Sequence, residues 1–189
     1  MSAIKKSMIT AVCLALCVVL PQAFHSIPNA GAIYCPIHIP VLLCGLICGW
    51  KYGLLCGVAG PVFSSLFTGM PAVAYLPPMM IECAVYGAVS GVRIPHFLAY
   101  AGKAGEEKEP VESKTGVRLY IRLILAMLAG RVVSGIVKAL IFSPGSYTMT
   151  LWVTGYFLTS LPGIVIQLVL IPAILYMLRK SAVIPDYAY

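Results

Sequence analysis

Charged side chains are scarce in this sequence. They make up 10% of the 189 residues, whereas hydrophobic residues make up 60%, and a soluble domain carries roughly a quarter charged residues. A water-soluble fold of this length cannot bury so much apolar surface. Disorder is excluded as well, because it requires low hydrophobicity and high net charge. The composition therefore predicts a single-domain integral membrane protein that lies in the lipid bilayer.

The sequence also lacks the motifs of several enzyme classes. It contains no GxxxxGK[ST] loop for nucleotide phosphates, no HExxH zinc motif and no GxSxG nucleophile turn. It has no CxxC pair and no Cys/His spacing typical of a metal site. We therefore expect no enzymatic activity, no metal and no cofactor, and we expect any ATP hydrolysis to be supplied by partner proteins.

Basic residues outnumber acidic residues, with 13 Lys and Arg against 6 Asp and Glu and a net charge of +7. In a soluble protein this excess indicates nucleic-acid binding. Here the basic residues flank hydrophobic segments, which is typical of orientation in a membrane, so no nucleic-acid partner is expected. The Cys residues, 7 in all, are odd in number, and all except Cys35 lie in apolar runs. We interpret them as packing residues rather than as a disulfide framework.

Hydrophobic runs predict an all-α bundle of six transmembrane helices, since a helix needs about 20 apolar residues to cross a bilayer. The long apolar stretch 37–92 is divided into three spans, because a Gly-Trp-Lys-Tyr-Gly segment and a Thr-Gly-Met-Pro segment interrupt it. The polar segment 95–116 is predicted to be a flexible cytoplasmic linker within the single domain 1–189. The predicted spans cover about 8–24, 37–49, 53–67, 75–92, 119–142 and 151–178.

Lys and Arg predict the side of the membrane on which each loop lies, because cytoplasmic loops carry an excess of them. With the N-terminus in the cytoplasm, the predicted outside loops (about 25–36, 68–74 and 143–150) contain no Lys or Arg. We therefore predict a multi-pass protein of the plasma membrane with both termini cytoplasmic. In an alternative interpretation, the first basic residues and apolar run are a cleaved signal peptide, which leaves five spans. The predicted cytoplasmic side holds Lys5, Lys6, Lys51, Arg93, Lys103, Lys108, Lys114, Arg118, Arg122, Arg179 and Lys180.

Two predicted spans carry charged residues that are costly in lipid and therefore face the protein interior. Glu82 lies in the outer half of the fourth span, and Tyr86 lies one turn further along the same face. The fifth span carries Arg131, Ser134 and Lys138 on one face. Arg131 suits bidentate binding of a carboxylate or phosphate. Glu82 is interpreted as an anchor for a cationic or N–H group of a ligand, as the partner of Arg131 in a structural ion pair, or as a protonated carboxyl group in the core.

Polar and small residues also form a stripe along the sixth predicted span, at spacings of three and four residues. Pro162 is expected to interrupt the helix beside this stripe. Trp152 can alternatively belong to the aromatic belt at the membrane surface, whereas Gln167 at mid-membrane favours a binding site. The stripe contains Trp152, Tyr156, Ser160, Gly163 and Gln167.

The first predicted outside loop and the start of the second span contain His25, Asn29 and His38. These residues either cap a cavity or are ordinary loop polarity. The combined polar and aromatic groups suit a small ring compound that bears hydrogen-bonding groups, with or without a carboxylate or phosphate. The candidate substrate-binding residues are Glu82, Tyr86, Arg131, Lys138, Trp152, Tyr156, Gln167, His38 and Asn29.

Small residues at i and i+4 let a second helix approach closely. Ala11 and Ala15 form such a pair in the first span, which is either a docking face for a partner helix or internal packing. Gly53 and Gly57 form a second pair in the third span.

A proline interrupts the third predicted span. Pro61 is expected to kink or break the helix, and Ser64 and Ser65 are expected to recapture the carbonyls that it frees. The Gly-Met-Pro turn that follows can shape the mouth of a cavity.

Together these features resemble the substrate-binding S-components of energy-coupling factor (ECF) transporters. The resemblance rests on the basic cytoplasmic end, on the Ala11 and Ala15 pair, and on the Pro-Ile-His-Ile-Pro sequence at the start of the second span. The matching segments are 11–15, 35–45, 64–71, 82–87 and 130–131.

The resemblance implies high-affinity uptake of a small, vitamin-like molecule in a prokaryote. It implies that the chain binds its substrate alone and then docks through Ala11 and Ala15 on a transmembrane coupling protein, where two ATPase subunits power release inside. It also implies that Glu82, the first outside loop and the outer ends of the last three spans line the binding site.

Two other classes of function stay open at this point. A self-sufficient secondary carrier or small channel needs a coupling-ion site, which a single acid within the spans supports poorly. A structural subunit of a membrane complex would pair Glu82, Arg131 and Lys138 internally. Binding by the purified chain alone argues against the structural subunit, and transport without ATPases argues against the S-component.

Overall fold

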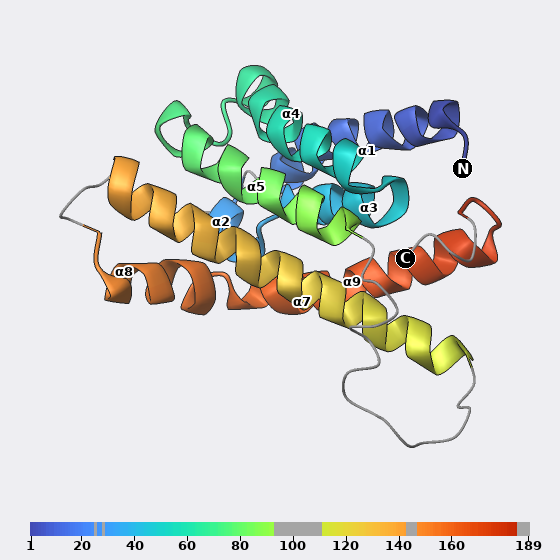
Figure 1. Cartoon of the computed structure of the whole chain (residues 1–189). Helices are drawn as coiled ribbons and strands as arrows, with labels where there is room; N and C mark the ends of the chain where they lie inside the picture. The colour runs from blue at the N-terminus through green and yellow to red at the C-terminus, as the bar shows by residue number, and fades with distance from the viewer. Residues whose placement is uncertain (25, 28, 93–110, 143–146, 185–189) are drawn as a thin grey trace, which may run out of the picture.

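The computed structural model describes residues 1–24, 26–27, 29–92, 111–142 and 147–184 of the chain. Every regular element in these ranges is helical, which confirms the predicted helical class (Figure 1). The elements are α1 (Ala3–Ala23), α2 (Ala30–Tyr34), α3 (His38–Cys48), α4 (Trp50–Thr68), η1 (Val73–Tyr75), α5 (Leu76–Gly91), α7 (Val111–Val137), η2 (Lys138–Phe142), α8 (Met149–Val153), η3 (Thr154–Leu158) and α9 (Leu161–Lys180).

Within the described ranges, 5 helical stretches are long and apolar enough to cross a membrane. α4 has 19 residues, which at 1.5 Å per residue gives about 28 Å, close to the roughly 30 Å of a bilayer core. α4 is not among the 5 apolar stretches, because it contains polar residues such as Lys51 and Ser64. The sixth span therefore stays a prediction. The stretches are Ala3–Ala23, Ala30–Cys48, Val73–Gly91, Gly116–Phe142 and Leu161–Lys180.

The central helix of the bundle is α3, in which every residue is buried. α1, α4, α5 and α9 pack around it. Gly53 of α4 faces Gly87 of α5 so closely that a Cβ on either residue would meet the backbone of the other helix. Gly57 lies in the same way against the Cys83 carbonyl. The predicted small-residue pair of α4 therefore packs inside the protein.

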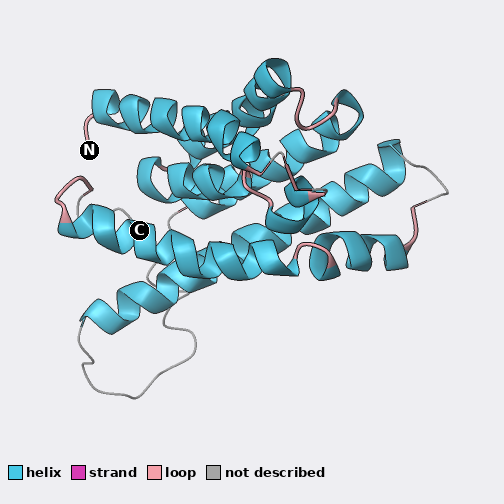
Figure 2. Cartoon of the chain, turned by 180° about the vertical axis from the view of Figure 1, so that it is seen from behind, coloured by secondary structure: helices cyan, strands magenta, loops and turns pink. Residues whose placement is uncertain are grey.

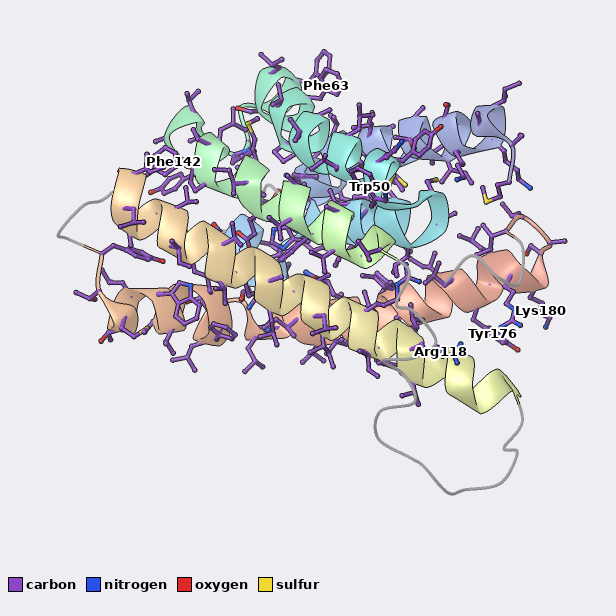
Figure 3. The ribbon with its side chains drawn as sticks, in the orientation of Figure 1. Trp50, Phe63, Arg118, Phe142, Tyr176 and Lys180 are labelled. Atoms are coloured by element: carbon purple, nitrogen blue, oxygen red, sulfur yellow. The ribbon has the colours of Figure 1, made fainter. Side chains whose placement is uncertain are left out.

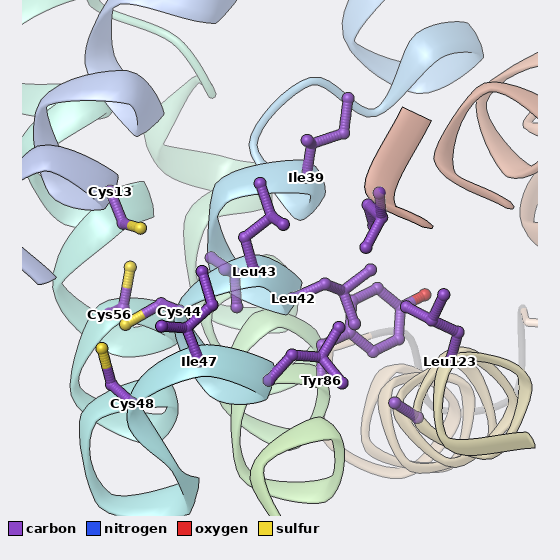
Figure 4. Close-up of a cluster of buried hydrophobic side chains, with 14 of the residues drawn as sticks. Cys13, Ile39, Leu42, Leu43, Cys44, Ile47, Cys48, Cys56, Tyr86 and Leu123 are labelled. Carbon is purple, nitrogen blue, oxygen red and sulfur yellow. The ribbon is translucent and has the colours of Figure 1, made fainter. Parts of the chain in front are cut away.

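The cysteines belong to the core. All seven are buried and have free thiols. Figure 4 shows Cys13, Cys44, Cys48 and Cys56 with their sulfur atoms directed toward one another, and Cys44 Sγ lies 3.5 Å from Thr10 Oγ1. Thiols are weak hydrogen-bond donors and pack as small apolar groups, which is the role predicted from their place in apolar runs.

Basic residues gather at one end of the bundle. The start of α1 and the end of α9 lie at this end, on the right of Figure 1 and on the left of Figure 2. Figure 3 shows Arg118 and Lys180 toward the same end and Phe142 at the opposite end. Arg122 is buried, and its Nη2 donates a hydrogen bond to Ser90 O over 2.6 Å, which ties α7 to the last turn of α5.

Pro61 lies inside α4 without ending it. Ser64 Oγ donates to Met70 O over 2.6 Å, and Ser65 Oγ donates to Pro71 O over 2.9 Å. The prediction that these serines recapture carbonyls freed by the proline is therefore wrong. Both hydroxyls point forward to the chain that turns back after α4, and they secure that turn.

The helix of the sixth predicted span is interrupted, as Pro162 indicated. η3 ends at Leu158, and α9 begins at Leu161 with a proline in its first turn, where no N–H is needed. Two further helical segments lie where no helix was predicted: α2 lies in the first predicted outside loop, and α7 begins at Val111, inside the predicted linker. Most of that linker lies outside the described residues.

Candidate functional site

A chain of hydrogen bonds links a carboxylate, a phenol and a guanidinium inside the bundle. Glu82 and Tyr86 project from α5 and Arg131 projects from α7, and all three side chains are buried. The Tyr86 hydroxyl donates to Glu82 Oε1 over 2.7 Å and accepts a bond from Arg131 Nε over 3.1 Å. In the described part of the chain, Glu82 and Arg131 thus interact through Tyr86 rather than as a direct ion pair.

The packing of α5 against α7 explains why these side chains meet. Gly130 precedes Arg131, and a Cβ on Gly130 would overlap the Tyr86 ring. The ring therefore lies directly against the α7 backbone, and its hydroxyl reaches the guanidinium. From α3, the His38 ring meets Tyr86 edge to face, with 4.8 Å between ring centroids and 87° between planes. Tyr86 is held by neighbours on both helices.

The segment of α8 and η3 completes the hydrogen-bonded cluster. Arg131 Nη1 donates to the Tyr156 carbonyl, which also accepts a bond from Ser160 Oγ over 2.6 Å. The Tyr156 and Ser134 hydroxyls lie 2.7 Å apart, and Ser134 Oγ donates to Pro78 O over 3.3 Å. The helix break before α9 leaves the Tyr156 carbonyl available to side-chain donors. We call Glu82, Tyr86, Arg131, Ser134 and Tyr156 the polar cluster.

Trp152 of α8 and Phe157 of η3 both contact Arg131. Trp152 Nε1 donates to Arg131 O over 3.1 Å, and the indole fills the space that a Cβ on Gly135 would occupy. The Arg131 guanidinium lies 5.4 Å from the Phe157 ring centroid, which is a cation–π distance. The indole N–H of Trp152 thus binds a backbone carbonyl beside the polar cluster, which favours its interpretation as part of the site.

Two buried polar side chains have atoms without a partner. Gln167 is 0% exposed and His38 is 4% exposed. Among the described residues, neither Gln167 Nε2 nor Gln167 Oε1 has a hydrogen-bond partner, and neither does His38 Nδ1. Buried polar groups are almost always paired, and an unpaired one costs about 1–3 kcal/mol. These atoms have the capacity to bind a polar group from outside the chain.

Gln167 and His38 lie on helices that pack against each other. α9 buries the face that carries Gly163, Gln167 and Ile171, and it packs against α2 and α3. A Cβ on Gly163 would meet the Tyr34 carbonyl at the end of α2. The chain then runs through a short turn to His38 at the start of α3. Gln167 follows Gly163 by one helical turn on the same buried face of α9.

Other predicted residues lie away from the polar cluster. Lys138 begins η2, and its Nζ lies 5.1 Å from the Tyr147 ring centroid. Burial, followed by the charge of Glu82, raises the pKa of Tyr147. Asn29 is exposed at the start of α2, and its side chain makes no capping bond. His25 lies outside the described residues.

Sequence reasoning left Ser134 and Phe157 out of the candidate set. Ser134 had a usable signal, since it lies three residues after Arg131 on the same helical face. Phe157 had none, because its position under the guanidinium depends on how η3 folds back against α7.

The fold and the site define a helical, multi-pass membrane protein. Its interior contains buried polar side chains, and some of their atoms have no hydrogen-bond partner among the described residues. A family model described as "ECF transporter, substrate-specific component" matches residues 5–175, and the chain belongs to this family. The predicted resemblance is confirmed. No curated protein and no solved structure gives a significant match. The protein is thus the substrate-binding subunit of an ECF importer and not an enzyme.

Proposed function

We propose that the chain captures a small, vitamin-like molecule at the outer side of the plasma membrane, with six spans and both termini in the cytoplasm. In this orientation the basic residues at the start of α1 and the end of α9 face the cytoplasm, as the positive-inside rule requires. The end of the bundle that carries α8 then faces outward, and the polar cluster lies in the outer half.

The observation that carries the proposed site is the unpaired state of the buried Gln167 amide and of His38, whose ring meets Tyr86. A purely structural role accounts for the bonds between Glu82, Tyr86 and Arg131, but it leaves the Gln167 amide unexplained. Glu82 has further capacity, because only one of its two carboxylate oxygens accepts a bond from a described residue. We assign ligand contact to Glu82, His38 and Gln167.

The Arg131 guanidinium has a different role in this proposal. Its Nε and Nη1 are already bonded to Tyr86 and to the Tyr156 carbonyl, and Trp152 binds its backbone carbonyl. Arg131 therefore holds η3 against α5 and α7, and it shapes the outer wall of the site together with Trp152 and Tyr156.

Docking on a coupling protein is proposed to use α1. Ala11 and Ala15 are exposed on α1, whereas Cys13 and Cys17 form its buried face. A pair of small residues on a free face permits close approach of a partner helix. We propose that this partner is the transmembrane coupling protein, whose two ATPase subunits drive release of the substrate to the inside.

Reconstituted transport tests this function. Proteoliposomes that contain the chain together with its coupling protein and ATPases should accumulate substrate only with ATP, and the purified chain alone should bind it. Ala11→Trp and Ala15→Trp should abolish uptake and leave binding unchanged, because the bulk blocks helix approach far from the site. Val169→Trp is the matched control, since Val169 is 66% exposed on α9.

Two outcomes contradict the proposal. Uptake by the chain without ATPases would identify a secondary carrier or channel. A folded chain that binds no small molecule would identify a structural subunit.

A further inference from the structure

We propose that Gln167 binds a cyclic amide of the substrate, that is, a lactam, imide or cyclic urea whose N–H and C=O lie on the same side of a flat ring. This inference rests on the proposed function and defines the substrate class for the same site. It starts from one observation, which is that both ends of a fully buried side-chain amide lack a partner among the described residues.

The donor and acceptor pattern of Gln167 restricts the ligand. Its Nε2 donates and its Oε1 accepts, so complete pairing requires an acceptor and a donor next to each other on the ligand. A carboxylate or phosphate only accepts, and it would leave Oε1 unpaired. An ammonium group only donates, and it would leave Nε2 unpaired. An amide edge satisfies both atoms with two parallel hydrogen bonds.

In a secondary amide, ring closure is what places the two groups on one side. An open-chain secondary amide is trans, so its N–H and C=O point in opposite directions, and the cis form is disfavoured. A lactam, imide or cyclic urea holds the cis arrangement by its covalent geometry. The pairing therefore favours a heterocycle over a peptide-like substrate.

The charges around the site favour a neutral ligand. The polar cluster already contains one buried acid and one buried guanidinium, and Tyr86 bridges them. The Arg131 guanidinium is engaged by Tyr86, by the Tyr156 carbonyl and by the Phe157 ring. A ligand carboxylate would add a further negative charge to this interior, which is costly away from water when it has no partner. A neutral ring adds no such charge.

The test uses the full-length chain in detergent with Trp50→Phe, which leaves Trp152 as the reporter because the chain has 2 Trp residues. The probe is quinazoline-2,4-dione, an aromatic imide. Its 1,3-dimethyl derivative has no N–H donor, and benzoate supplies a carboxylate on a similar ring. Binding is measured by the change in Trp152 fluorescence.

The proposal predicts that the imide binds about 10- to 100-fold more tightly than its dimethyl derivative, which is the loss expected for one or two buried hydrogen bonds. Gln167→Leu should remove this preference. The variant should keep or raise the melting temperature, because Leu removes unpaired polar atoms and breaks no bond. Gln22→Leu, at an exposed position on α1, is the matched control and should keep the preference.

Several results overturn the proposal, and they separate it from the proposed function. Equal affinity for the imide and its dimethyl derivative, or unchanged imide binding in Gln167→Leu, means that Gln167 does not pair with a cyclic amide. Binding of benzoate alone, abolished by Arg131→Gln, rejects the cyclic amide and leaves the S-component function intact. A folded wild-type chain that binds no probe and carries no small molecule through purification rejects both.

Discussion

Replacing Tyr86 with Phe removes one oxygen atom from the centre of the polar cluster and leaves the ring in place. The hydroxyl donates to Glu82 over 2.7 Å and accepts from Arg131 over 3.1 Å, so the change removes two bonds to charged groups. The ring keeps its contacts with Gly130 and His38. The effect therefore reports the hydrogen-bonded link itself and not the loss of packing.

The magnitude follows from the bonds that are lost. A hydrogen bond to a charged group contributes about 1.5–3 kcal/mol to stability. Two independent bonds would therefore contribute about 3–6 kcal/mol. Because both bonds share one oxygen, they are not independent, and we expect a loss near the lower end, about 3 kcal/mol. In a protein of this size, 1 kcal/mol corresponds to roughly 2–4 °C in melting temperature. The variant should melt roughly 6–12 °C below wild type.

The assay is thermal unfolding of the purified chain in detergent. Tyr176→Phe is the control, since Tyr176 is 64% exposed on α9 and loses only a solvent- or lipid-facing hydroxyl (Figure 3). If Tyr86→Phe melts at the same temperature as Tyr176→Phe, the hydroxyl does not join Glu82 to Arg131, and the description of the polar cluster is wrong.

Two further predictions concern packing and orientation. Gly130→Ala should destabilise the chain by about 1–3 kcal/mol, because the added Cβ overlaps the Tyr86 ring. Gly116→Ala on the same helix meets no atom and should be neutral or stabilising by up to about 1 kcal/mol; equal melting of the two variants would contradict the packing. Met149→Cys should be labelled by an impermeant thiol reagent added outside intact cells, and Lys180→Cys only after the membrane is opened. The reverse pattern would overturn the proposed orientation.

The fold class and the charged residues of the site could be predicted from the sequence alone. A composition with few charges leaves a helical membrane bundle as the simplest solution, and lipid forces Glu82 and Arg131 toward the interior wherever their helices lie. Tyr86 follows from Glu82 because it lies one helical turn further along. These conclusions depend only on the cost of placing a charge in lipid and on the spacing of residues along a helix. Neither requires knowledge of how the helices pack.

The connections within the site could not be predicted, because they depend on how helices rotate against one another. Tyr86 stands between Glu82 and Arg131 only because Gly130 lets α5 rest on the α7 backbone. Trp152 was predicted to line the site, but only the fold of α8 against Gly135 shows that its N–H binds Arg131 O. The unpaired state of Gln167 is likewise a property of the packed bundle and not of the sequence around it.

The helix break before α9 could be predicted only in part. Pro162 indicated that the helix is interrupted, but the continuous apolar run 151–178 did not indicate which groups would bind the carbonyl that the break frees. It separates η3 from α9 and frees the Tyr156 carbonyl for Arg131 and Ser160. A proline thus predicts where regular structure fails, whereas the partner of the freed carbonyl is set by tertiary contacts.

The most direct test of the proposed binding site compares wild type with Glu82→Gln by native mass spectrometry and by thermal melting. The account predicts that the wild-type chain carries a bound small molecule and that Glu82→Gln binds it about 10- to 100-fold more weakly, as expected for a charge-assisted hydrogen bond of roughly 1.5–3 kcal/mol. The variant should stay folded. Unchanged loading of Glu82→Gln, together with a loss of melting temperature that Arg131→Gln restores, would show that Glu82 belongs to a structural pair and would contradict the assigned site.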